Sequence, residues 1–123
     1  MDVTPLVARD RQVIERYGAS GFQVSGVAYS GAILVLPQAT HLWPVAAVAE
    51  ATRANLVPIV DAAVHILLLG CGKKMVPVSP LLRQELRACG IVIDAMDTGA
   101  ACRTYNVLLA EDRRVAAALL PLR

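Results

Sequence analysis

The second half of the chain alternates short apolar runs with segments of helical periodicity. The apolar runs cover residues 64–69, 91–96 and 114–120. Each has the length of a strand and is bounded by turn residues, so we predict three buried strands. Helical patterns accompany them near residues 53–62, from Ser79 to Gly90 and from Asp97 onward. Strands and helices that alternate roughly every dozen residues are typical of parallel strands joined by right-handed crossovers. The sequence therefore predicts an α/β domain with about three helices.

The last apolar run allows two interpretations. Its three consecutive alanines, residues 116–118, favour a helix by propensity. The turn-like residues 111–113 before it and Pro121 after it favour a strand. We predict a strand over residues 114–120.

The first 45 residues are expected to be rich in β structure. Apolar residues alternate on both sides of Ser25-Gly26, which indicates a β-hairpin. A buried strand is predicted over residues 32–36, stopped by Pro37. A further short strand is predicted around Trp43-Pro44, at an edge because proline cannot donate to a ladder. Residues 1–18 form a leading arm with room for one short strand.

Composition limits the classes of function. The 123 residues form one domain, residues 1–123, and 56% of them are hydrophobic while 18% are charged. Globular chains typically carry roughly 25% charged residues, so apolar surface is expected to remain for a partner, a second copy or a membrane face. The net charge of +2 and five scattered aromatic residues exclude a nucleic-acid interface.

The sequence also limits location and metal binding. The N-terminus lacks the basic region of a signal peptide, and the longest apolar run is broken by Pro58, Asp61 and His65. Three widely spaced cysteines indicate reduced thiols in a cytoplasmic protein. Two histidines and no cysteine pair make a metal site unexpected.

The stretch from Asp97 to Asn106 concentrates hydrogen-bonding side chains in an otherwise apolar chain. On a helical wheel Cys102 and Tyr105 share the apolar arc, so we expect a core thiol rather than a catalytic one. We expect Asp97 or Thr98 to cap the helix, with a general base as the alternative role of Asp97. The polar arc carries the residues expected to face a partner or a ligand: Arg103, Thr104 and Asn106.

The loop from Gly70 to Lys74 follows a predicted strand and is rich in glycine and lysine. Ligands bind at strand carboxyl ends, and glycines let backbone amides approach an anion. The spacing matches no phosphate-binding motif, so a plain glycine loop with two solvated lysines is the alternative.

Several segments together resemble a known family. They are Met96-Asp97-Thr98, residues 101–106, Glu111 with Arg113, and Ala-Ala-Leu-Leu-Pro at 117–121. This pattern resembles the Mth-domain family, which includes a mitochondrial NADH dehydrogenase (complex I) assembly factor and uncharacterised bacterial proteins. The resemblance implies a three-layer fold around a central mixed sheet whose last strand is antiparallel to its neighbours. It implies no catalytic residues and no cofactor. With no transit peptide in evidence, a bacterial member is expected.

Two functions follow as hypotheses. The first, implied by the resemblance, is a non-enzymatic assembly or interaction module that contacts complex I subunits or assembly factors. We expect it in the cytoplasm, at most peripheral to the inner membrane, with a homo-oligomer as a further possibility. The alternative is an anionic small-molecule site, with weak catalysis at most, between the Gly70–Lys74 loop and the Asp97–Asn106 helix start. The candidate ligand- or partner-binding residues are Gly70, Gly72, Lys73, Asp97, Thr98, Arg103, Thr104, Asn106 and Arg113.

Overall fold

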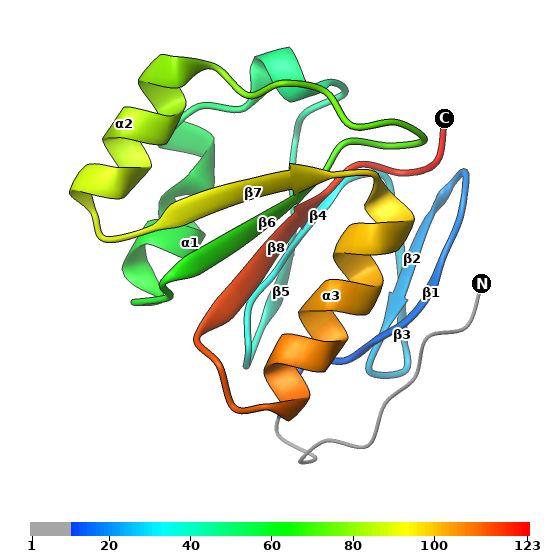
Figure 1. Cartoon of the computed structure of the whole chain (residues 1–123). Coiled ribbons are helices and arrows are strands. Elements are labelled where there is room, and N and C mark those ends of the chain that lie inside the picture. Colours follow the sequence, from blue (N-terminus) through cyan, green and yellow to red (C-terminus); the bar gives the residue numbers. More distant parts are fainter. Residues whose placement is uncertain (1–10) are drawn as a thin grey trace.

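A five-stranded mixed sheet forms the middle layer of the computed structural model, which describes residues 11–123 (Figure 1). In spatial order its strands are β5 (Thr40–Leu42), β4 (Ile33–Val35), β8 (Val115–Leu119), β6 (Ile66–Gly70) and β7 (Val92–Met96). The three predicted strands of the second half are thus confirmed, and the short apolar runs explain them.

The direction of β8 corrects one detail of the expected topology. β8 runs parallel to β6 and antiparallel to β4, so it is antiparallel to only one of its two neighbours. The helix α3 (Thr98–Ala110) explains the parallel pairing. It carries the chain back to the end of the sheet where β6 and β7 begin, so β8 must run in their direction.

Both faces of the sheet are buried, and side chains alternate between two apolar clusters. All five residues of β8 are buried. Ala116 and Ala118 belong to one cluster, whereas Val115, Ala117 and Leu119 belong to the other. This alternation is the period-two geometry of a strand covered on both sides.

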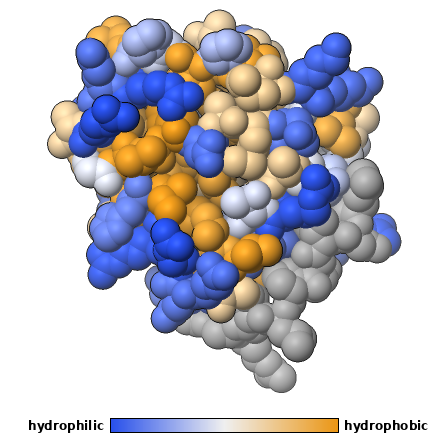
Figure 2. Space-filling model, viewed as in Figure 1, coloured by the Kyte–Doolittle hydropathy of each residue, from blue (hydrophilic) through white to orange (hydrophobic). Residues whose placement is uncertain are grey.

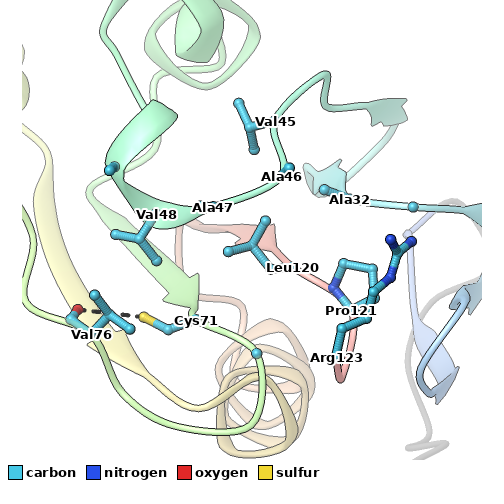
Figure 3. A pocket seen from close by; sticks show the side chains of 13 residues that line it. Ala32, Val45, Ala46, Ala47, Val48, Cys71, Val76, Leu120, Pro121 and Arg123 are labelled. Atoms are coloured by element: carbon cyan, nitrogen blue, oxygen red, sulfur yellow. Dashed lines mark hydrogen bonds between the residues drawn. The ribbon is translucent and has the colours of Figure 1, made fainter.

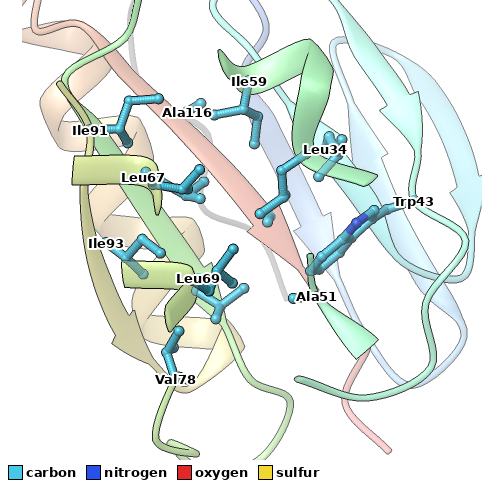
Figure 4. Packing of buried hydrophobic residues seen from close by; sticks show 14 of the residues in the cluster. Leu34, Trp43, Ala51, Ile59, Leu67, Leu69, Val78, Ile91, Ile93 and Ala116 are labelled. Atoms are coloured by element: carbon cyan, nitrogen blue, oxygen red, sulfur yellow. The ribbon is translucent and has the colours of Figure 1, made fainter. Parts of the chain in front are cut away.

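Helices cover one face (Figure 4). They are α1 (Val57–Asp61), α2 (Pro80–Ala88) and the short 3-10 turns η1 (Val48–Glu50) and η2 (Ala54–Leu56). Trp43 packs in this layer instead of in a strand, because β5 already ends at Leu42. The expected strand at Trp43-Pro44 is therefore displaced by a few residues. The α2 boundaries are as predicted, with Pro80 in the first turn and Gly90 at a φ of 81° just past the end.

The opposite face is covered by α3 and by a small antiparallel sheet (Figure 1). That sheet consists of β1 (Ile14–Tyr17), β2 (Gly21–Val24) and β3 (Val27–Ser30). Ser25 and Gly26 have positive φ angles of 44° and 83°, as a two-residue hairpin requires, which confirms the predicted turn. The leading arm contributes β1, while its residues 1–10 lie outside the described part of the chain. The three-layer α/β fold is confirmed.

The close packing of β6 against α3 requires a residue without a side chain at Gly70, and this requirement can be tested. A Cβ atom at Gly70 would lie 2.8 Å from Leu119 Cδ2 and 3.1 Å from the backbone Cα of Thr98. We expect Gly70→Ala to lower the free energy of unfolding by about 1–3 kcal/mol, because the backbone must shift to make room. Urea denaturation measures this change. Gly18→Ala is the matched control, since a Cβ there meets nothing within 4 Å. Equal stability of the two variants would contradict this packing.

Candidate functional site

The carboxyl ends of the parallel strands meet at one edge of the sheet, where Thr98 joins three segments. Its hydroxyl donates to the carbonyl oxygen of Leu120 at 2.5 Å and accepts from the amide of Gly72 at 2.8 Å. Its own amide donates to the Gly72 carbonyl at 2.8 Å. Thr98 is fully buried, so it clamps the loop after β6 and the end of β8 to the start of α3. It lies inside the fold and not on a partner-facing surface.

Hydrogen bonds within the protein occupy the backbone amides with which this loop would bind an anion. The amide of Gly72 is bound to Thr98, and the amide of Cys71 donates to the carbonyl of Met96 at 2.9 Å. Gly70 is buried against Thr98 and Leu119. Lys73 is exposed. The loop thus joins α3 to the sheet, and these two amides are not directed at a ligand.

Asp97 caps α3, as predicted. Its carboxylate accepts from the amide of Ala100 at 2.9 Å, which satisfies a donor that the first helical turn leaves free.

Cys102 is a core thiol. It is fully buried, and burial raises its pKa from 9.0 to about 12, although the charge of Arg103 acts in the opposite direction. The thiolate is the nucleophilic form of cysteine, so this environment suppresses nucleophilic reactivity. Burial likewise raises the pKa of the neighbouring phenol, Tyr105, whose hydroxyl donates to the carbonyl of Gln12 at 3.1 Å.

Asn106 corrects the helical-wheel assignment. It was expected on the outward polar arc, but only 2% of it is exposed. Its Oδ1 accepts from the amide of Ile14 at 3.1 Å, and its Nδ2 donates to the carbonyl of the same residue at 2.7 Å. The helical-wheel prediction was wrong because α3 packs against two neighbours, the central sheet and β1. The buried arc of the helix is therefore wider than its apolar arc. The side-chain amide joins β1 to the helix.

The remaining candidate residues are distributed along α3. Arg103 is exposed and donates from Nη1 to the hydroxyl of Tyr17 at 3.0 Å. Thr104 is half-buried on the flank of α3 opposite Asn106, the residue that faces β1. Arg113 is exposed beyond the C-terminal end of the helix. The structure brings together the loop, Asp97 and Thr98, but it separates Arg113 from them by the length of α3.

A pocket of about 370 Å³ opens at the same sheet edge, on the far side of the loop from α3 (Figure 3). Residues that follow β6 and β8, together with the segment 45–49, line it. Its walls are chiefly aliphatic. The Cys71 thiol donates to the carbonyl of Val76 at 3.6 Å, and Arg123 lies at the rim. Asp97 and Arg103 do not line it. The cavity is therefore not the one expected between the loop and the helix start.

A second surface feature lies between β7 and α3, where apolar residues form a band across the face of the molecule (Figure 2). Val92 of β7 is 54% exposed. Ile66, Met96 and Leu108 are half-buried at the border of the apolar cluster that lies between α3 and the central sheet. We call this surface the β7–α3 strip, and it consists of Ile66, Val92, Asp94, Met96, Thr104 and Leu108. Sequence reasoning missed it, because Val92 lies within an apolar run that predicts a fully buried strand.

Two further features concern metals and membranes. Within residues 11–123 no group of three or more histidine, cysteine, aspartate or glutamate side chains is placed to hold a metal ion. No helix in that range has the length and apolar character needed to cross a bilayer.

Comparison with known proteins identifies the family. Residues 14–120 match the model of a family described as "Protein of unknown function (DUF498/DUF598)". The chain belongs to this family. An uncharacterised protein of Rhodobacter capsulatus is 37% identical over 109 residues, which cover 89% of this chain and 84% of that protein. The solution structure of a Bordetella pertussis Mth938-like domain has a TM-score of 0.82 and 31% identity, covering 99% of this chain and 93% of that one. The resemblance seen in the sequence is confirmed.

The DUF498/DUF598 family also links the chain to eukaryotic assembly factors. NADH dehydrogenase (ubiquinone) 1 alpha subcomplex assembly factor 3 of Xenopus tropicalis is 31% identical over 110 residues. The match covers 88% of this chain and 60% of that factor, so the chain spans about 60% of the relative's length. This chain is thus homologous to complex I assembly factors.

The buried thiol predicts a specific pH dependence of stability. The folded state holds the Cys102 proton up to a pKa of about 12, whereas the unfolded thiol titrates near 9.0. The unfolded state therefore binds fewer protons in this window, and stability falls as pH rises above about 9. We expect urea denaturation to give a steeper alkaline decline for the wild type than for Cys102→Ser, by up to about 1.4 kcal/mol per pH unit. Parallel slopes for the wild type and Cys102→Ser would contradict the account.

Proposed function

We propose that this chain is a non-catalytic interaction module that takes part in respiratory complex I assembly by binding subunits or other assembly factors. The observation that carries the proposal is the match to an NADH dehydrogenase assembly factor across 88% of the chain. The match to the family model, residues 14–120, includes the whole three-layer domain from β1 to β8. A role of this domain in the factor is therefore a role that this chain can share.

The interior of the site supports a binding role over a catalytic one. Three of the most conspicuous polar side chains of the 97–106 stretch serve the fold: Asp97 as a cap, Thr98 as a clamp and Asn106 as a bridge to β1. The Cys102 thiol is held protonated by burial. A catalytic acid, base or nucleophile needs access to a substrate, which the buried Thr98, Cys102 and Asn106 lack. The half-buried Asp97 carboxylate is engaged in the helix cap.

The surface supports the same proposal. The β7–α3 strip combines the exposed Val92 with half-buried apolar neighbours, and adjoining apolar residues at a surface often mark sites of protein contact. We place the module in the cytoplasm, where protein partners would hold it at the inner membrane. Self-association through the same surface is a competing use of the strip.

Affinity capture from native membranes tests the proposal. Tagged protein, expressed at its natural level in the organism that encodes it, should enrich complex I subunits or assembly proteins. Membranes from a strain that lacks the complex I genes provide the matched control for nonspecific capture. If complex I proteins are no more abundant in the capture than with an unrelated tagged protein, the proposal is wrong.

A further inference from the structure

We propose that the β7–α3 strip receives an amphipathic helix of the partner protein, apolar on one face and carrying lysine or arginine along its flank. This inference rests on the proposed function and specifies the surface and the chemistry of the contact.

The layout of the layers leaves room for one helix at this place. On this face of the sheet, α3 packs against β6 and β8, and the β1–β3 sheet lies beyond it towards β4 (Figure 1). β7 is the edge strand of the central sheet, and it lies on the side of α3 that is away from β4. Packed helices lie about 8–10 Å apart, which is about two strand spacings. A helix placed next to α3 would therefore lie over β7.

The floor of the strip is apolar except at Asp94, which lies between Val92 and Met96 along β7. Val92 pairs with Ile66 in the ladder between β7 and β6, so the two side chains lie beside each other on the same face. Met96 extends this row towards the carboxyl end of β7, and Leu108 borders it from α3. The row offers a helix a surface for residues at three- and four-residue spacing.

The outer edge of β7 is poorly suited to pairing with a strand of another protein. Its face, in contrast, can receive a helix. The Val92 amide donates to the His65 carbonyl, and the Cys71 amide donates to the Met96 carbonyl, so alternate residues of β7 face β6. Ile93 falls between them and faces the outer edge. There the Arg83 side chain donates from Nη1 to the Ile93 carbonyl at 2.7 Å. A charged side chain bound across an edge is a common device against strand pairing.

The charge at the strip selects a basic helix. Asp94 is exposed on the same face of β7 as Val92. Glu111, at the C-terminal end of α3, is also exposed. It follows Thr104 by seven residues and therefore lies on the same flank of the helix. One carboxylate thus lies within the row of the floor, and a second lies at its border on α3. A partner helix with lysine or arginine on its flank complements them, whereas an acidic helix is repelled.

Site-specific photo-crosslinking tests the inference in the full chain. A benzoylphenylalanine group replaces Val92, and in the matched control it replaces Val27, which is 52% exposed on the β1–β3 sheet. Both proteins are expressed in the native organism, irradiated and digested, and the crosslinked peptides are sequenced. We expect the Val92 probe to label one segment of a complex I subunit or assembly protein. That segment should have apolar residues at three- and four-residue spacing with lysine or arginine beside them, and the Val27 probe should not label it.

A binding measurement with the labelled segment completes the test. A synthetic peptide of that segment should bind the wild-type protein, and Asp94→Lys should weaken binding about tenfold at low salt. Val27→Ser should leave binding unchanged, and all variants should keep the wild-type melting temperature. Equal binding by Asp94→Lys would overturn the charge assignment.

The other crosslinking outcomes also decide the question. Labelling of a second copy of the chain, of lipid, or of an extended or acidic segment would overturn the inference. So would the absence of labelling at Val92. If affinity capture still enriches complex I proteins in that case, the partner binds elsewhere and the proposed function stands. If capture also fails, both proposals fall.

Discussion

The position of β8 in the middle of the sheet is the constraint on which the rest of the structure depends. The chain places its last strand between β4 and β6, so within residues 11–123 the N-terminal strands β4 and β5 pair with the rest of the central sheet only through β8. Its alternating side chains contribute to both apolar clusters. Three alanines in its centre add little bulk, which lets the layers on both faces approach closely. Thr98 then binds the end of this strand to the β6 loop and to α3.

The polar stretch at the start of α3 is best understood as the hydrogen-bonding counterpart of that arrangement. A helix packed between the central sheet and β1 needs its first turn capped and its flanks joined to both neighbours. Asp97, Thr98 and Asn106 supply the cap, the link to the sheet and the link to β1. In the described part of the chain, no buried side-chain nitrogen or oxygen lacks a hydrogen-bond partner. A residue pattern that resembles an active site is thus explained by the packing of one helix.

Periodicity and turn chemistry were enough to predict most of the fold. The apolar runs predicted β6, β7 and β8, Ser25-Gly26 predicted the hairpin, and Ser79-Pro80 predicted the start of α2. The surfaces were harder to predict, because they depend on which elements become neighbours. The burial of Asn106 follows from β1, which is 92 residues away in the sequence. The exposure of Val92 follows from the edge position of β7, and strand order is not encoded in the local pattern of the strand. The same limit applies to the pocket at the strand ends, where the aliphatic segment 45–49 forms part of the wall.

Side chains that build the domain are distinct from side chains that are available to a partner, and complex I accumulation in the native organism tests that distinction. Cells that depend on variants of this chain would be compared for the amount of assembled complex I, with chain levels and melting temperatures matched. We predict that Val92→Glu and Asp94→Lys lower the amount of assembled complex, whereas Lys73→Ala and Arg103→Ala leave it unchanged. Loss of the complex in the Lys73 and Arg103 variants, with normal levels in the Val92 and Asp94 variants, would contradict the account. That result would instead indicate that the Gly70–Lys74 loop and the start of α3 carry the function.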